Sequence, residues 1–174
     1  MTTAARVATF MTRIVVVATA LAASAAAIGS LTPFVANAQA SRQPIAIVVN
    51  PKSGVTDLSF AELRRVFLGQ QQYWPDRSKV TLLVRAPVAR ERAVVLDQIY
   101  RMDEDQFRQY WIGKMFRAEV AGGPKIVYSA DMAMSLVAVI PGSITFVPAS
   151  AVPADVRILR IDGKLPSDPG YALK

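Results

Sequence analysis

The chain has 174 residues, of which 52% are hydrophobic and 19% charged, with a net charge of +7 and no Cys or His. That length allows one domain or two small lobes. The missing residue types exclude disulfides, thiolate nucleophiles, Ser-His triads and metal sites built on Cys or His. A binding protein, a structural module, or an enzyme that uses only carboxylates, Lys, Tyr or Ser remains.

Residues 1–40 have the pattern of a secretory signal peptide. Two arginines precede an apolar, Ala-rich stretch over residues 14–29, and two overlapping small-x-small sites end at Ala38 and Ala40. An uncleaved membrane anchor is the alternative, but this stretch is shorter than the roughly 20 residues that a spanning helix needs. We therefore expect a periplasmic or secreted mature chain, residues 41–174, that contacts a membrane only through its signal segment.

The first half of the mature chain alternates strand and helix. A β-branched apolar run predicts a buried strand over residues 45–49. A capping box at Ser59 begins an amphipathic helix that ends before Gly69. A polar turn at residues 74–76 then leads to a second strand over residues 80–84.

The second half continues the alternation and ends in a loose, Pro-rich tail. A helix is predicted over residues 89–100, and Asp103 caps another helix whose aromatic stripe we interpret as core packing. Two further strands are predicted over residues 125–128 and 143–147, with a helix over residues 130–139 between them. A last strand is predicted over residues 156–161. This order predicts an α/β domain with a partly parallel sheet.

Two chain crossings, at residues 80–86 and 120–126, divide the predicted elements. We expect a sheet lobe of residues 44–80 and 125–165 and a small helical lobe of residues 88–120. A ligand cleft between lobes this unequal would be shallow.

The first candidate site is the loop after the first strand, with Asn50, Lys52, Ser53 and Gly54. Ligands in open α/β sheets lie beyond the carboxyl ends of strands. Lys52 supplies charge, Ser53 a hydroxyl and Gly54 close access to the backbone, which suit an oxyanion. An ordinary turn with a solvated lysine explains the same residues equally well.

Arg85 and Ser129 follow two other predicted strands. The planar guanidinium of Arg85 suits phosphate or carboxylate, and Ser129 could present its hydroxyl to a ligand. A helix-capping role is the simpler interpretation of Ser129. For Arg90 and Arg92 we favour a solvated basic helix face. We expect Asn50 to Gly54, Arg85 and Ser129 to converge on one ligand site.

Consecutive carboxylates at residues 103–105 offer no catalytic or metal site, because they point in different directions along a helix and first-turn capping explains them. We find neither converging carboxylates nor an activated lysine. The sequence therefore favours a protein that is not an enzyme and has no cofactor.

Several segments together resemble the periplasmic phosphate-binding proteins of ABC transporters, of the type II periplasmic binding protein superfamily. The most specific combination is a helix that ends in Val-Phe-Leu-Gly before a Trp-Pro-Asp turn. The matching segments run through nearly all of the mature chain, at residues 45–51, 58–69, 74–76, 107–111, 139–147 and 156–163.

The resemblance implies a truncated type II fold, because the chain is about half as long as a full receptor. In those relatives an arginine precedes a Ser-Gly-Thr loop that contacts the oxyanion. Arg85 matches that arginine, whereas residues 86–90 replace the loop.

Two function hypotheses follow, and a third, an enzyme, is the weakest. The chain is a solute-binding protein for phosphate or another small oxyanion, with an ABC permease or other envelope protein as partner. Alternatively, it is an envelope adaptor or regulator that keeps the fold without binding such a ligand. An exported protein with a net charge of +5 over its 134 mature residues meets anionic solutes or envelope polymers rather than nucleic acid.

We predict that the exported protein begins at Gln39 or Ser41, because the two small-x-small sites end just before these residues. Intact-mass measurement of the exported protein tests this. A mass that still includes residues 14–29 would show that the segment is an anchor.

Overall fold

The computed structural model describes residues 43–174, and its first element is the predicted strand β1 (Ile45–Val49). All five residues of β1 are buried. Ile45, Ile47 and Val49 pack into one apolar cluster, whereas Ala46 and Val48 pack into a second cluster on the other face. An unbroken apolar run is therefore required here, because both faces of the strand are covered.

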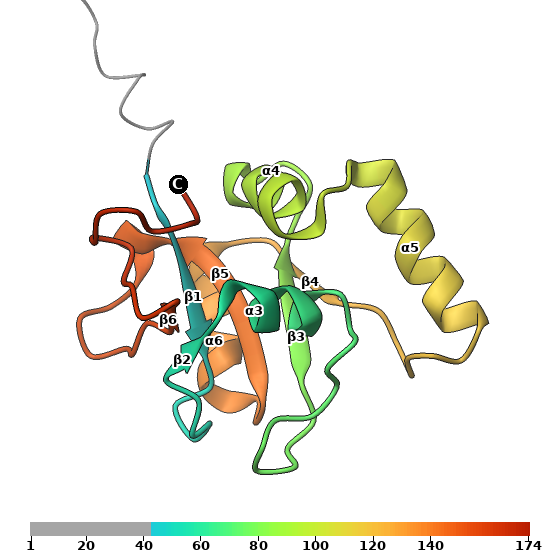
Figure 1. Ribbon diagram of the computed structural model, residues 1–174, viewed down its shortest axis with the longest axis horizontal. Coiled ribbons are helices and arrows are strands. Elements are labelled where there is room, and N and C mark those ends of the chain that lie inside the picture. The colour runs from blue at the N-terminus through green and yellow to red at the C-terminus, as the bar shows by residue number, and fades with distance from the viewer. Residues whose placement is uncertain (1–42) are drawn as a thin grey trace, which may run out of the picture. The chain divides into compact units, whose positions relative to one another are not determined.

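The sheet is mixed, with the strand order β1-β5-β3-β4 (Figure 1). Strand β3 (Thr81–Arg85) is parallel to both of its neighbours, β4 (Lys125–Val127) and β5 (Ser143–Pro148). Strand β1 is antiparallel to β5. Two short strands, β2 (Asp57–Leu58) and β6 (Arg160–Ile161), form a separate parallel pair.

Helices cover both faces of the sheet. One apolar cluster joins the sheet to α3 (Phe60–Phe67), η1 (Leu96–Tyr100) and α5 (Glu104–Phe116). The π-helical segment η1 continues directly from α4 (Arg90–Val95). The second cluster joins the opposite face to α6 (Ala130–Val139), and the short 3-10 helix η2 (Ala149–Ala151) follows β5. The result is a three-layer arrangement with one sheet at its centre.

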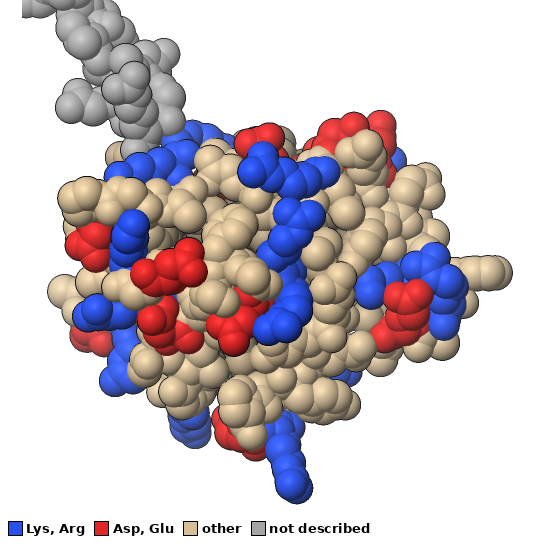
Figure 2. Space-filling model, viewed as in Figure 1, with Lys and Arg blue, Asp and Glu red and all other residues tan. Residues whose placement is uncertain are grey.

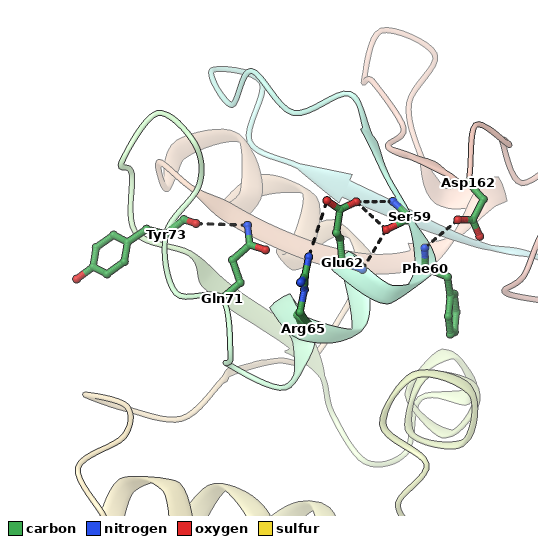
Figure 3. A network of polar contacts seen from close by, with 7 residues as sticks. All are labelled: Ser59, Phe60, Glu62, Arg65, Gln71, Tyr73 and Asp162. Carbon is green, nitrogen blue, oxygen red and sulfur yellow. Dashed lines mark hydrogen bonds and ion pairs between the residues drawn. The ribbon is translucent and has the colours of Figure 1, made fainter.

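The predicted capping box at the start of α3 is confirmed (Figure 3). The Ser59 hydroxyl accepts a hydrogen bond from the Glu62 amide, and the Glu62 carboxylate accepts one from the Ser59 amide at 2.9 Å. The Phe60 amide donates to Asp162 at 3.0 Å. A carboxylate from the distant C-terminal region thus satisfies another free amide of the first helical turn.

The predicted turn at residues 74–76 is fixed against the start of β5. The Trp74 indole nitrogen donates to the Gly142 carbonyl at 2.9 Å, and the side chain is buried. Gly142 has a φ of 69°, and a Cβ atom there would overlap the Lys79 carbonyl oxygen. Glycine is therefore required at this position.

The α/β class is confirmed, but residues 88–120 do not form a separate helical lobe. Val95, Ile99, Tyr100, Phe107 and Trp111 from this segment share one core with the sheet. The helices of this segment bury their apolar faces against the sheet. The predicted chain crossings at residues 80–86 and 120–126 did not indicate this packing.

Two smaller differences concern the strands. The strand expected over residues 156–161 is reduced to Arg160–Ile161, with an isolated bridge between Val48 and Ile158. Strand β2 was not predicted, because two residues give no periodic signal. The predicted signal peptide lies outside the described residues. Within residues 43–174, no helix is long and apolar enough to cross a membrane.

Replacement of Ser59 with Ala should lower the free energy of unfolding by about 1 kcal/mol, because an α3 amide loses its cap. Hydrogen bonds from Ser59 also hold the pKa of Glu62 below its ordinary value of 4.5. That contribution is complete at neutral pH and is lost as the pH falls from 4.5 through the lower pKa of the folded protein.

Urea unfolding of the wild type and the Ser59→Ala variant, at pH 7 and at pH 3, measures both effects. Ser167→Ala is the matched control, since Ser167 is exposed and lies outside any helix. Equal stability of Ser59→Ala and Ser167→Ala would contradict the capping argument.

Candidate functional site

The parallel pair β3 and β4 brings two of the predicted ligand residues to one edge of the sheet. Arg85 pairs in register with Val127 at the carboxyl ends of these strands, and Ser129 follows two residues later. The Arg85 Nη1 atom donates to the Val127 carbonyl at 3.4 Å. This is the edge where α/β sheets place ligands.

The loop from Asn50 to Gly54 lies at the opposite edge, so the expected convergence of all these residues is wrong. Because β1 is antiparallel to β5, Val49 lies beside Ile144, and the Asn50 amide donates to the Ser143 carbonyl at 2.9 Å. Ser143 aligns with the first residue of β3, whereas Arg85 is its last. The argument from strand ends holds only for strands that run the same way.

Asn50 has a structural role in that loop. The side chain is 2% exposed, and its amide donates to the Val137 carbonyl at 2.8 Å and the Ala138 carbonyl at 3.2 Å. The side-chain oxygen accepts from the Lys52 amide. Asn50 thus links β1 to the last turn of α6, where backbone carbonyls lack helical partners.

The other three loop residues are less constrained. Ser53 is buried, and its hydroxyl accepts a 3.4 Å hydrogen bond from the Val55 amide. Lys52 and Gly54 are exposed, and a Cβ atom at Gly54 would meet nothing within 4 Å. Ligand contact by these residues stays a prediction.

The Arg85 guanidinium forms an ion pair with a carboxylate of its own chain. Its Nε atom donates to Glu91 Oε1 at 2.7 Å, and only 10% of the arginine side chain and 9% of the glutamate side chain are exposed. Glu91 lies in the first turn of α4, which directs its carboxylate toward the end of β3.

The interpretation of Arg92 as part of a solvated basic face is wrong. Arg92 is 3% exposed and forms a two-pronged ion pair with Glu104, at 2.6 and 2.8 Å. It also donates to the Arg85 carbonyl at 2.8 Å, and its guanidinium lies 4.8 Å from the centre of the Phe107 ring. The side chain therefore links β3, α4 and α5.

Ser129 caps α6, as its simpler interpretation predicted. Its hydroxyl accepts a hydrogen bond from the Met132 amide at 3.0 Å. The side chain is exposed beside the carboxyl end of β4. A contact between Ser129 and a ligand remains a prediction.

Apolar side chains are exposed at the same edge as Arg85. Val88, in the connection between β3 and α4, is 95% exposed, and Tyr128, directly after β4, is 74% exposed. The Ala86 amide donates to the Val127 carbonyl at 2.9 Å, which brings the two connections side by side. This edge therefore carries a buried charge pair and two exposed apolar side chains.

No family model and no curated protein matches the sequence. Solved structures do match in fold. An ABC-type phosphate transport receptor from Vibrio cholerae has a TM-score of 0.58 at 20% identity, over 71% of this chain and 48% of the receptor. A putative phosphate ABC transporter substrate-binding protein from Clostridium perfringens, with bound phosphate, has a TM-score of 0.56 at 16% identity, over 69% and 45%.

A third structure, PstS from Borrelia burgdorferi, gives a TM-score of 0.56 at 15% identity, over 71% of this chain and 49% of that protein. The described residues therefore share the fold of about half of these receptors, as the sequence resemblance predicted. The chain matches about half the length of these receptors. At such low identity, the likeness concerns the fold and not the ligand.

We expect Asn50→Ala to lower the free energy of unfolding by about 1–3 kcal/mol, because carbonyls at the end of α6 lose their buried donor. Urea unfolding measures this, with Lys52→Ala as the control from the same loop. A loss below 0.5 kcal/mol, about the size of an ordinary surface effect, would show that Asn50 is not a structural link.

Proposed function

We propose that this chain is an exported solute-binding protein, not an enzyme, that binds a phosphate-like oxyanion non-covalently at the edge formed by β3 and β4. The observation that carries the proposal is the position of Arg85, at the carboxyl end of a parallel strand in a fold shared with phosphate receptors. Within residues 43–174, Arg85 Nη2 makes no hydrogen bond, which leaves both of its N–H groups for a ligand.

The Glu91 carboxylate limits the affinity of Arg85 for an oxyanion. A bound oxyanion would have to share the Arg85 guanidinium with Glu91, whose negative charge opposes the ligand. The protein is therefore a weaker binder than a receptor with an unpaired arginine would be. Ser129 follows Val127, the register partner of Arg85, by two residues, and in this proposal its hydroxyl is a further donor to the anion.

The surface supports a small anion as the ligand. On the face that Figure 2 shows, acidic side chains lie among the basic ones, so the positive charge is not gathered into one continuous field. A nucleic acid would need such a field along its backbone. We propose that the protein acts in the periplasm or is secreted, and that an ABC permease or another envelope protein is its partner.

A second candidate function is favoured by the apolar surface above Arg85. If the Arg85–Glu91 pair excludes every anion, the exposed Val88 and Tyr128 suit contact with another protein. The chain would then be an envelope adaptor or regulator that keeps the fold without its ligand.

Isothermal titration with phosphate and with sulfate distinguishes these functions. Glu91→Gln should bind phosphate about tenfold more tightly than the wild type, because a charge-assisted hydrogen bond is worth about 1.5–3 kcal/mol. Arg85→Gln should abolish binding. Arg108→Ala, which removes an exposed arginine on α5, should have no effect. Circular dichroism confirms that each variant is folded.

Equal loss in Arg85→Gln and Arg108→Ala would indicate diffuse electrostatic attraction instead of a site. If neither the wild type nor Glu91→Gln binds phosphate or sulfate at millimolar concentration, the oxyanion proposal fails. Capture of an envelope protein by the wild type, but not by Val88→Asp, would then support the adaptor.

A further inference from the structure

A cavity of about 280 Å³ lies at the edge of the sheet opposite Arg85. Its walls come from four separate stretches of the chain, namely residues 66–72, residues 79–82, Trp111 of α5 and residues 120–125. Residues 79–82 and 120–125 lead into the amino ends of the parallel strands β3 and β4. The volume is close to the lower end of the range for small-molecule sites, about 300–1,000 Å³.

The walls of this cavity are held in place by contacts between distant residues. The Gln72 side-chain amide donates to the Glu119 carbonyl at 2.8 Å, and the Tyr110 hydroxyl donates to the Leu68 carbonyl at 2.7 Å. Arg117 and Lys114 donate to the Glu119 carboxylate and hold its pKa below the ordinary value. These contacts hold residues 66–72 against α5 and the segment that follows it.

The lining combines an apolar floor with a cationic rim. Buried apolar side chains form the floor, from Val66, Leu82, Trp111 and Val120. Lys79 and Lys125 lie on the rim, and none of the lining residues is acidic. Neither lysine has an ion pair within residues 43–174, in contrast to Arg85. Gly122 in the lining is exposed, and a Cβ atom there would meet nothing within 4 Å.

We infer that this cavity binds a small organic carboxylate, with its apolar body on the floor near Trp111 and its charge between Lys79 and Lys125. Two unpaired ammonium groups and the lack of an opposing acid favour an anion. The apolar floor favours a ligand with a hydrocarbon part, which inorganic phosphate lacks. The site is separate from Arg85 and does not rest on the proposed oxyanion function.

Benzoate is a suitable probe, with benzyl alcohol as the uncharged counterpart and phosphate as the anion without an apolar body. The protein has two tryptophans, so proton–nitrogen NMR spectra contain two indole signals. Trp111 lines the cavity, whereas Trp74 does not and serves as an internal control. Benzoate should shift the Trp111 signal to saturation at millimolar concentration, and benzyl alcohol and phosphate should not.

The double variant Lys79→Ala/Lys125→Ala should weaken benzoate binding about tenfold, as expected for the loss of two exposed charge contacts. Lys174→Ala, at the exposed C-terminal residue, is the matched control and should bind normally. Arg85→Gln should also bind benzoate normally, even if it no longer binds phosphate.

Three results would overturn the inference. These are a benzoate effect of equal size on both indole signals, unchanged binding by the double lysine variant, and loss of benzoate binding in Arg85→Gln. Phosphate binding at Arg85 can fail while benzoate binding succeeds, and the reverse, so the two proposals are tested independently.

Discussion

A series of four charged side chains, three of them buried, joins the end of β3 to two helices, and the arrangement at the carboxyl ends of β3 and β4 depends on it. Arg85 pairs with Glu91, while Arg92 pairs with Glu104 and also donates to the Arg85 carbonyl. Removing one member of a buried ion pair typically costs about 3–5 kcal/mol, because the other charge is left without a partner. The same contacts that fix α4 and α5 therefore restrict what Arg85 can bind.

This arrangement gives Arg85 a partner from its own chain. Pro87 and the exposed Val88 stand in the connection that follows Arg85, and no glycine lies between β3 and α4. Glu91, in the first turn of α4, supplies a negative charge to the Arg85 guanidinium. The charge of Arg85 is therefore already balanced by a short, charge-assisted hydrogen bond within the chain.

The elements themselves could be predicted from local patterns, but the site could not. The alternation from β1 to α6, the Ser59 capping box and the Ser129 cap all follow from neighbouring residues. The direction of β1 does not, because an apolar run has the same pattern in a parallel and in an antiparallel strand. The partners of Arg92 were also hidden, since Glu104 is 12 residues away and lies on another helix.

The cavity beside Trp111 was beyond sequence reasoning for a related reason. Its lining comes from four stretches of chain, and the Val-Phe-Leu-Gly motif at the end of α3, which is part of one of them, has no polar side chain that would point to a ligand. Lys79 and Lys125 each resemble a solvated lysine when considered alone, and only the parallel pairing of β3 and β4 brings their segments to one edge. The two edges of a single sheet thus differ in charge pairing. Arg85, the residue expected to bind a ligand, is paired with Glu91, whereas Lys79 and Lys125 have no ion pair within residues 43–174.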